Sequence, residues 1–62
     1  MAGVKAELSS MQTALEEIEL RVRRITDELS RDPSDTVSVH LIAVERALAS
    51  AIRGIAKAQK SA

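Results

Sequence analysis

The sequence predicts an all-α protein: an antiparallel two-helix hairpin, coiled-coil-like, that dimerises into a four-helix bundle. Apolar residues recur at alternating steps of four and three in both halves of the chain, and the single proline falls between the halves. The chain has 62 residues, no cysteine and one histidine, so disulfides and metal clusters within one chain are excluded. Chains below roughly 70 residues usually need such supports or a second subunit, and association is the route that remains.

The first helix is expected over about residues 4 to 31, a stretch that no glycine or proline interrupts. Glu17 precedes Arg21 by four residues and Glu19 precedes Arg23 in the same way, which stabilises an exposed helix by a few tenths of a kcal/mol per pair. The apolar positions form the a/d seam of a coiled coil. These positions are Val4, Leu8, Met11, Leu15, Ile18, Val22, Ile25 and Leu29.

The turn is expected at Asp32 and Pro33, in the segment SRDPSDT. Pro33 lacks an N–H and its ring would clash inside a helix, but it suits the first position of a new helix. Asp32 is then the expected N-cap, and Asp35 completes a variant of the capping box three residues later. The second helix is therefore expected over about residues 33 to 60, and so short a connection makes the two helices antiparallel neighbours.

The second half of the chain repeats the four-three pattern. Folding the chain at Pro33 brings Leu29 opposite Val37 and Val4 opposite Ala62, and the numbers of every facing pair add up to 66. Toward the open end, large residues of the first helix meet alanines of the second, which lets the backbones approach. The second seam consists of Val37, Leu41, Val44, Leu48, Ala51, Ile55, Ala58 and Ala62.

The second helix carries more apolar surface than one neighbouring helix can cover. Left open, that surface would favour aggregation, and Gly54 in mid-helix costs about 1 kcal/mol relative to alanine unless a close approach of another backbone offsets it. We therefore expect a homodimer in which the second helices meet. Its interface is predicted at Ile42, Ala49, Ile52 and Ala56.

This layout resembles that of ROP, a small hairpin that dimerises into a bundle with alanine-leucine core layers. The resemblance is one of layout, and no sequence motif is shared.

Composition argues against several classes of function. The formal net charge is zero, and no Phe, Tyr or Trp is present to stack on a nucleobase or a planar cofactor. Candidate catalytic groups are Ser, Glu and the single histidine, His40, and four aliphatic helices offer them no obvious pocket. We therefore expect no enzymatic activity, no catalytic residue, no cofactor and no metal site.

The chain has no apolar run as long as a membrane span and no apolar signal region near its start. We therefore expect no membrane association and a cytoplasmic location. The composition favours Leu, Ala, Arg and Val over Phe, Tyr, Asn and Lys, which indicates a GC-rich bacterial genome.

The favoured function is an interaction module, a small adaptor, assembly or regulatory protein that binds another protein through its outer helical faces. The segment EEIELRVRR places one leucine away from the seam, among charged residues. Single exposed leucines are common, but one flanked by arginines can be a hot spot. The candidate partner-binding residues are Leu20, Arg23 and Arg24.

Two alternatives stay open. The first is a ROP-like RNA- or DNA-binding hairpin that uses a basic ridge on the second helix: Arg46, Arg53, Lys57 and Lys60. The second is an obligate heteromer, in which a different chain completes the hairpin, as in an antitoxin, a docking segment or an anti-sigma factor.

Overall fold

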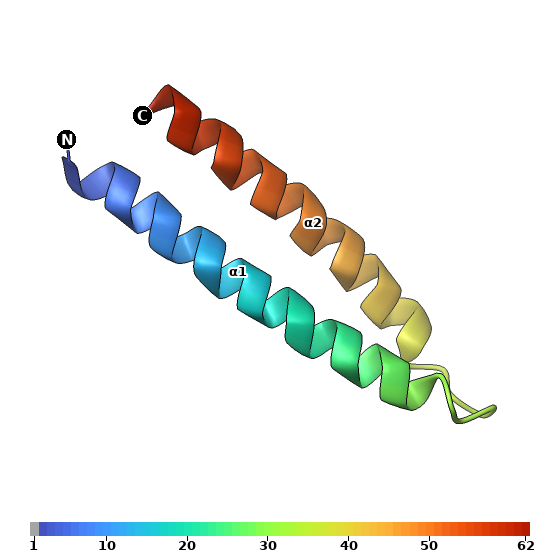
Figure 1. Cartoon of the computed structure of the whole chain (residues 1–62). Helices are drawn as coiled ribbons and strands as arrows, with labels where there is room; N and C mark the ends of the chain where they lie inside the picture. The colour runs from blue at the N-terminus through green and yellow to red at the C-terminus, as the bar shows by residue number, and fades with distance from the viewer. Residues whose placement is uncertain (1) are drawn as a thin grey trace.

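A computed structural model describes residues 2–62, with side chains from residue 3 onward. Helix α1 spans Ala2–Leu29 and helix α2 spans Ser38–Ser61. The helices lie side by side and antiparallel in a rod 50 Å long, and the start of α1 and the end of α2 lie at the same end of this rod (Figure 1). Within residues 2–62 there is no strand, so the prediction of an all-α hairpin is confirmed for the single chain.

The connection between the helices is longer than the sequence predicts, because Pro33 belongs to a turn of its own. The backbone N–H of Asp35 donates to the carbonyl of Asp32 at 3.1 Å, so residues 32–35 form a reverse turn with proline in its second position. The Asp32 carboxylate accepts hydrogen bonds from the N–H and the hydroxyl of Ser34, at 3.0 and 2.8 Å. Asp32 is therefore engaged in the loop and does not cap α2, which begins at Ser38 instead of about residue 33.

The N-cap position of α2 is Val37, which has no side-chain capping bond, and Asp35, two residues earlier, supplies a carboxylate to the start of the helix instead of Asp32. The Asp35 carboxylate accepts hydrogen bonds from the N–H of Val37 at 2.8 Å and from the N–H of Ser38 at 3.2 Å. The first N–H groups of a helix have no acceptor within the helix, so a carboxylate at this place stabilises the helix start. The loop of residues 30–37 thus uses one aspartate for the turn and the other for the start of α2.

The half-buried residues of α1 follow a four-three spacing, but they only partly coincide with the predicted seam. One half-buried row coincides with part of the predicted seam, and we call it the shared row: Leu8, Leu15, Val22 and Leu29. The second half-buried row is polar: Gln12, Glu19 and Thr26. The residues predicted in their place, Met11, Ile18 and Ile25, remain 43–49% exposed. Compared with the prediction, α1 is rotated about its own axis, so the row of Met11, Ile18 and Ile25 lies outside the contact with α2.

Helix α2 shows the same rotation. Its shared row consists of Leu41, Leu48 and Ile55, and its second half-buried row consists of Ser38, Glu45, Ile52 and Gln59. Val44 is 42% exposed, although the sequence analysis placed it against α1.

The rotation changes the register of the hairpin by one residue. Matching the half-buried rows from the loop to the open end pairs Leu29 with Ser38 and Leu8 with Gln59, so the numbers of each pair add up to 67 instead of 66. Most of these layers join an apolar residue to a polar one, and only Leu15 and Ile52 form a layer that is apolar on both sides.

Candidate interaction surfaces

The seam residues that leave the helix–helix contact form one apolar row on each helix. Six of the nine large hydrophobic side chains that are exposed within residues 3–62 belong to these rows. We call the two rows together the open apolar face. It consists of Val4, Met11, Ile18 and Ile25 on α1, of Val37 just before α2, and of Val44, Ala51 and the half-buried Ala58 on α2.

Both rows emerge on the same side of the hairpin. On each helix the apolar row lies three residues after the shared row and the second half-buried row lies four residues after it, so these two rows flank the shared row on opposite sides. The helices are antiparallel and pack through equivalent rows, so an approximate two-fold axis normal to the hairpin relates them. Such an axis places the two apolar rows next to each other on one face.

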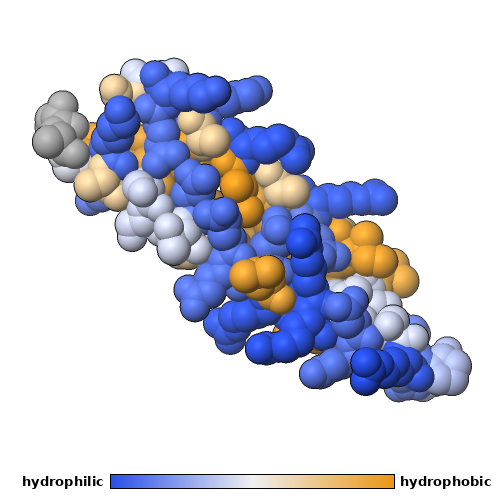
Figure 2. Space-filling view, in the orientation of Figure 1, coloured by the Kyte–Doolittle hydropathy of each residue, from blue (hydrophilic) through white to orange (hydrophobic). Residues whose placement is uncertain are grey.

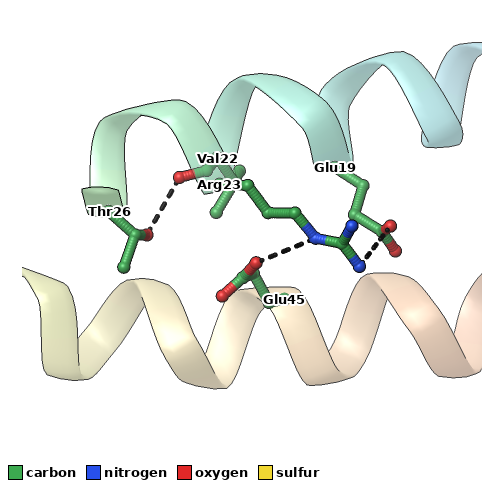
Figure 3. Close-up of polar contacts among 5 residues, drawn as sticks. All are labelled: Glu19, Val22, Arg23, Thr26 and Glu45. Atoms are coloured by element: carbon green, nitrogen blue, oxygen red, sulfur yellow. Dashed lines mark hydrogen bonds and ion pairs between the residues drawn. The ribbon is translucent and has the colours of Figure 1, made fainter. Parts of the chain in front are cut away.

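The opposite side of the hairpin carries an ion-pair bridge centred on Arg23. Its Nη2 lies 3.1 Å from Oε1 of Glu19, and its Nε lies 3.3 Å from Oε1 of Glu45 on α2 (Figure 3). The two glutamate side chains are 17% and 26% exposed, so two partly desolvated carboxylates share one guanidinium between the helices. Thr26 also lies at this contact, and its hydroxyl donates to the carbonyl of Val22 at 2.9 Å.

The four residues predicted for the dimer interface do not form an open surface in the structure. Ile52 lies on the row that Glu45 brings against α1, and it is half-buried. Ala49 and Ala56 are half-buried beside that row, and Ile42 is 43% exposed. These residues lie on the side of the Arg23 bridge, away from the open apolar face.

Sequence reasoning missed the open apolar face because it assigned both rows of each seam to the hairpin. The signal is nevertheless present in the sequence, since a four-three seam contains two rows and one neighbouring helix covers mainly one of them.

The predicted partner-binding residues separate into two groups. Leu20 is 64% exposed and Arg24 is exposed, and their spacing of four residues places them on the same side of α1. Arg23 is engaged by Glu19 and Glu45, so its guanidinium holds the two helices together. Leu20 and Arg24 therefore lie on the outer side of α1, whereas the partly exposed Arg23 also contacts α2.

The basic ridge lies on the outer side of α2. Its members are all exposed, and three of them recur every seven residues: Arg46, Arg53 and Lys60, with Lys57 beside them. Both ion pairs found within the described residues are made by Arg23, so neither involves the ridge. Figure 2 shows one face of the molecule, on which hydrophilic side chains predominate and hydrophobic surface is broken into small patches.

Three further findings bear on the function. Among residues 2–62, no three His, Asp or Glu side chains gather closely enough to hold a metal ion. Neither described helix has the length and the hydropathy needed to cross a membrane. Compared with protein-family models, with curated proteins and with solved structures, the chain finds no significant match.

Proposed function

We propose that this chain is a cytoplasmic, non-enzymatic interaction module, a homodimeric adaptor, assembly or regulatory protein that binds a protein partner through its outer helical faces. One observation carries the proposal: none of residues 3–62 is buried in the single hairpin. Folded proteins owe their stability mainly to buried apolar surface, and a hairpin without an interior lacks it. Association with another chain supplies the missing interior.

Partner binding would follow from the rigid display of one side of α1. This helix presents Leu20 next to the cation of Arg24, and a buried apolar anchor beside an arginine is typical of binding hot spots. A homodimer presents the pair twice, so a partner with two matching sites would gain avidity.

The first test is sedimentation equilibrium of the purified chain, combined with circular dichroism. The proposal expects a helical dimer at micromolar concentration. A poorly helical monomer would contradict it and would indicate the heteromeric alternative, in which an antitoxin, docking segment or anti-sigma factor folds on its target.

The second test locates the partner contact. A photo-crosslinking amino acid at Glu16, one turn before Leu20, should capture a protein partner in the native host cell, whereas the same group at Ser50, on the outer side of α2, should not. Leu20→Ala and Arg24→Glu should each weaken binding of that partner at least about tenfold and leave the dimer intact. Equal capture from both positions, or binding unaffected by either substitution, would exclude this side of α1.

The nucleic-acid alternative rests on the exposed ridge of four basic residues on α2. A phosphate binder loses affinity steeply as salt rises, with a slope that scales with the number of phosphates contacted. Anisotropy titrations with labelled RNA and DNA at low salt should show no binding if the main proposal holds. Salt-sensitive binding that Arg53→Glu abolishes would replace the main proposal by a ROP-like nucleic-acid binder.

A further inference from the structure

We propose that the second copy of the chain binds on the open apolar face, and that the two α2 helices pack against each other in antiparallel orientation at the centre of the dimer. The inference rests on the homodimer of the proposed function and specifies which face makes it. It differs from the interface that the sequence predicts at Ile42, Ala49, Ile52 and Ala56.

The composition of the face is the first argument. Six of the nine exposed large hydrophobic side chains lie on it, contributed by both helices, whereas the other three, Leu20, Val39 and Ile42, do not form a continuous row. An interface on that other side would also bury the partly exposed ion pairs of Arg23, which is costly unless every charge keeps its partners. The exposed large hydrophobic side chains are therefore concentrated on the open apolar face, away from the Arg23 bridge.

The size of the face matches what a dimer needs. The hairpin measures 50 Å by 14 Å, so a face that a second hairpin covers fully has a footprint of about 700 Å². A stable interface of standard size buries about 800 Å² on each partner. A second copy of the same length fits this face along its whole length, and a two-fold axis makes the face complementary to itself.

Small residues on α2 specify how closely the second copy approaches. Ala47 and Gly54 border the α2 row of the open apolar face on the side away from α1, next to Ala51 and Ala58. A Cβ added to Gly54 meets nothing within 4 Å, so nothing in its own hairpin requires a glycine there. A glycine in the middle of a helix weakens that helix relative to alanine. Close packing of α2 on the α2 of a second copy accounts for it.

The two-fold axis of the proposed dimer is expected to pass through the middle of the rod. When the half-buried rows are paired in this way, Ala51 lies level with Glu16, near the midpoint of α1. A two-fold axis through Ala51 overlaps the two hairpins fully and makes the α2 helices antiparallel. Val44 of one copy then lies beside Ala58 of the second copy.

Two isoleucines provide a matched test of the face. Ile18 lies on the open apolar face and Ile42 on the opposite side, and both are 43% exposed in the single hairpin. Ile18→Glu should raise the dissociation constant of the dimer at least about 100-fold, because each dimer would bury two unpaired carboxylates. Ile42→Glu should leave it within about threefold. Sedimentation equilibrium over a range of protein concentrations measures both.

The opposite result, dissociation by Ile42→Glu and not by Ile18→Glu, would overturn this inference and favour the interface predicted from the sequence. A wild-type dimer that neither substitution weakens overturns it as well. A wild-type chain that is monomeric refutes the dimer itself, and with it the proposed function, so the two failures are distinguishable.

Single cysteines test the geometry without a charged substitution. Disulfides form only where two Cα atoms approach within about 7 Å. Under mild oxidation Ala51→Cys should give a covalent dimer. Val44→Cys and Ala58→Cys should cross-link when they are mixed, and neither should cross-link alone. Cross-linking between two copies of the Val44→Cys variant would show that the α2 helices are parallel. If the chain is a dimer but none of the three cysteine variants forms a cross-link, the interface lies elsewhere.

Discussion

The Asp35 carboxylate accepts hydrogen bonds from N–H groups at the start of α2, and its charge matters for that role. The Ser38 side chain, together with the N–H groups of Val37 and Ser38, holds the pKa of Asp35 below its ordinary value. The N–H of Ser34, and then its hydroxyl, lower the pKa of Asp32 in the same way. A carboxyl with a lower pKa in the folded state stabilises the fold while it is ionised. That contribution is complete well above the ordinary pKa of 3.8 and is lost as the pH falls through the lowered value.

Substitutions at Asp35 separate the hydrogen bond from the charge. Asp35→Ala should lower the thermal midpoint at pH 7, because the N–H groups at the start of α2 lose their acceptor. Asp35→Asn keeps an acceptor, so its midpoint at pH 7 should stay close to that of the wild type but should fall less between about pH 5 and pH 3. Thermal melts followed by circular dichroism measure both effects, with Asp27→Asn in α1 as the control. Identical pH profiles for wild type and Asp35→Asn would contradict this role.

At the scale of single elements, α2, like α1, offers apolar residues on two sides. The row of Leu41, Leu48 and Ile55 packs toward α1, and the row of Val44 and Ala51 belongs to the open apolar face. Gly54 lies between that second row and the outer side of α2, and a Cβ added to it meets no atom within 4 Å in the single hairpin. The same glycine is thus unfavourable for the isolated helix and favourable for a close neighbour.

Gly54→Ala should therefore have opposite effects in two backgrounds. In a chain made monomeric by Ile18→Glu, it should raise helix content and stabilise α2 by up to about 1 kcal/mol. In the wild-type chain it should weaken the dimer, because the added methyl groups separate the two α2 helices. Gly3→Ala is the matched control, since a Cβ there also meets nothing within 4 Å. If Gly54→Ala strengthens the wild-type dimer, α2 does not pack closely at this position.

The sequence was sufficient to predict both helices, their antiparallel order and the row of Leu8 and Leu15. It did not determine the rotation of the helices, because Leu8 is followed both by apolar Met11 at three residues and by polar Gln12 at four residues. Hydrophobicity alone favours Met11 as the partner of α2. The structure places Gln12 there and leaves Met11 for an outer contact.

Two local features depend on more than the neighbouring sequence. Pro33 suits both the first turn of a helix and the second position of a reverse turn, and only the backbone bond from Asp35 to Asp32 distinguishes them. Arg23 is exposed, as expected, but its contact with Glu45 depends on the register between the helices, which the sequence of α1 does not show. The exposed positions of Leu20 and Arg24, by contrast, follow from helix periodicity alone.

At the scale of the whole molecule, the proposed dimer couples folding to association. No residue among 3–62 is buried in one hairpin, so most of the interior would form only when two chains meet. The stability of such a protein depends on its concentration, because mass action favours the folded dimer as protein is added.

The thermal midpoint should accordingly rise with protein concentration, by about 5 °C for each tenfold increase. Melting curves recorded from low to high micromolar concentration would measure this dependence, and the Ile18→Glu variant should show none. A wild-type midpoint that is independent of concentration would mean that the hairpin is stable on its own.

The position of the two ends of the described chain has a consequence for the geometry of the dimer. Both ends of the described chain lie at the same end of a rod 50 Å long, opposite the loop (Figure 1). In an antiparallel dimer these ends point in opposite directions. Anything joined to the termini of the two copies would then be held about 50 Å apart, so the dimer would act as a spacer of fixed length between two attached cargoes.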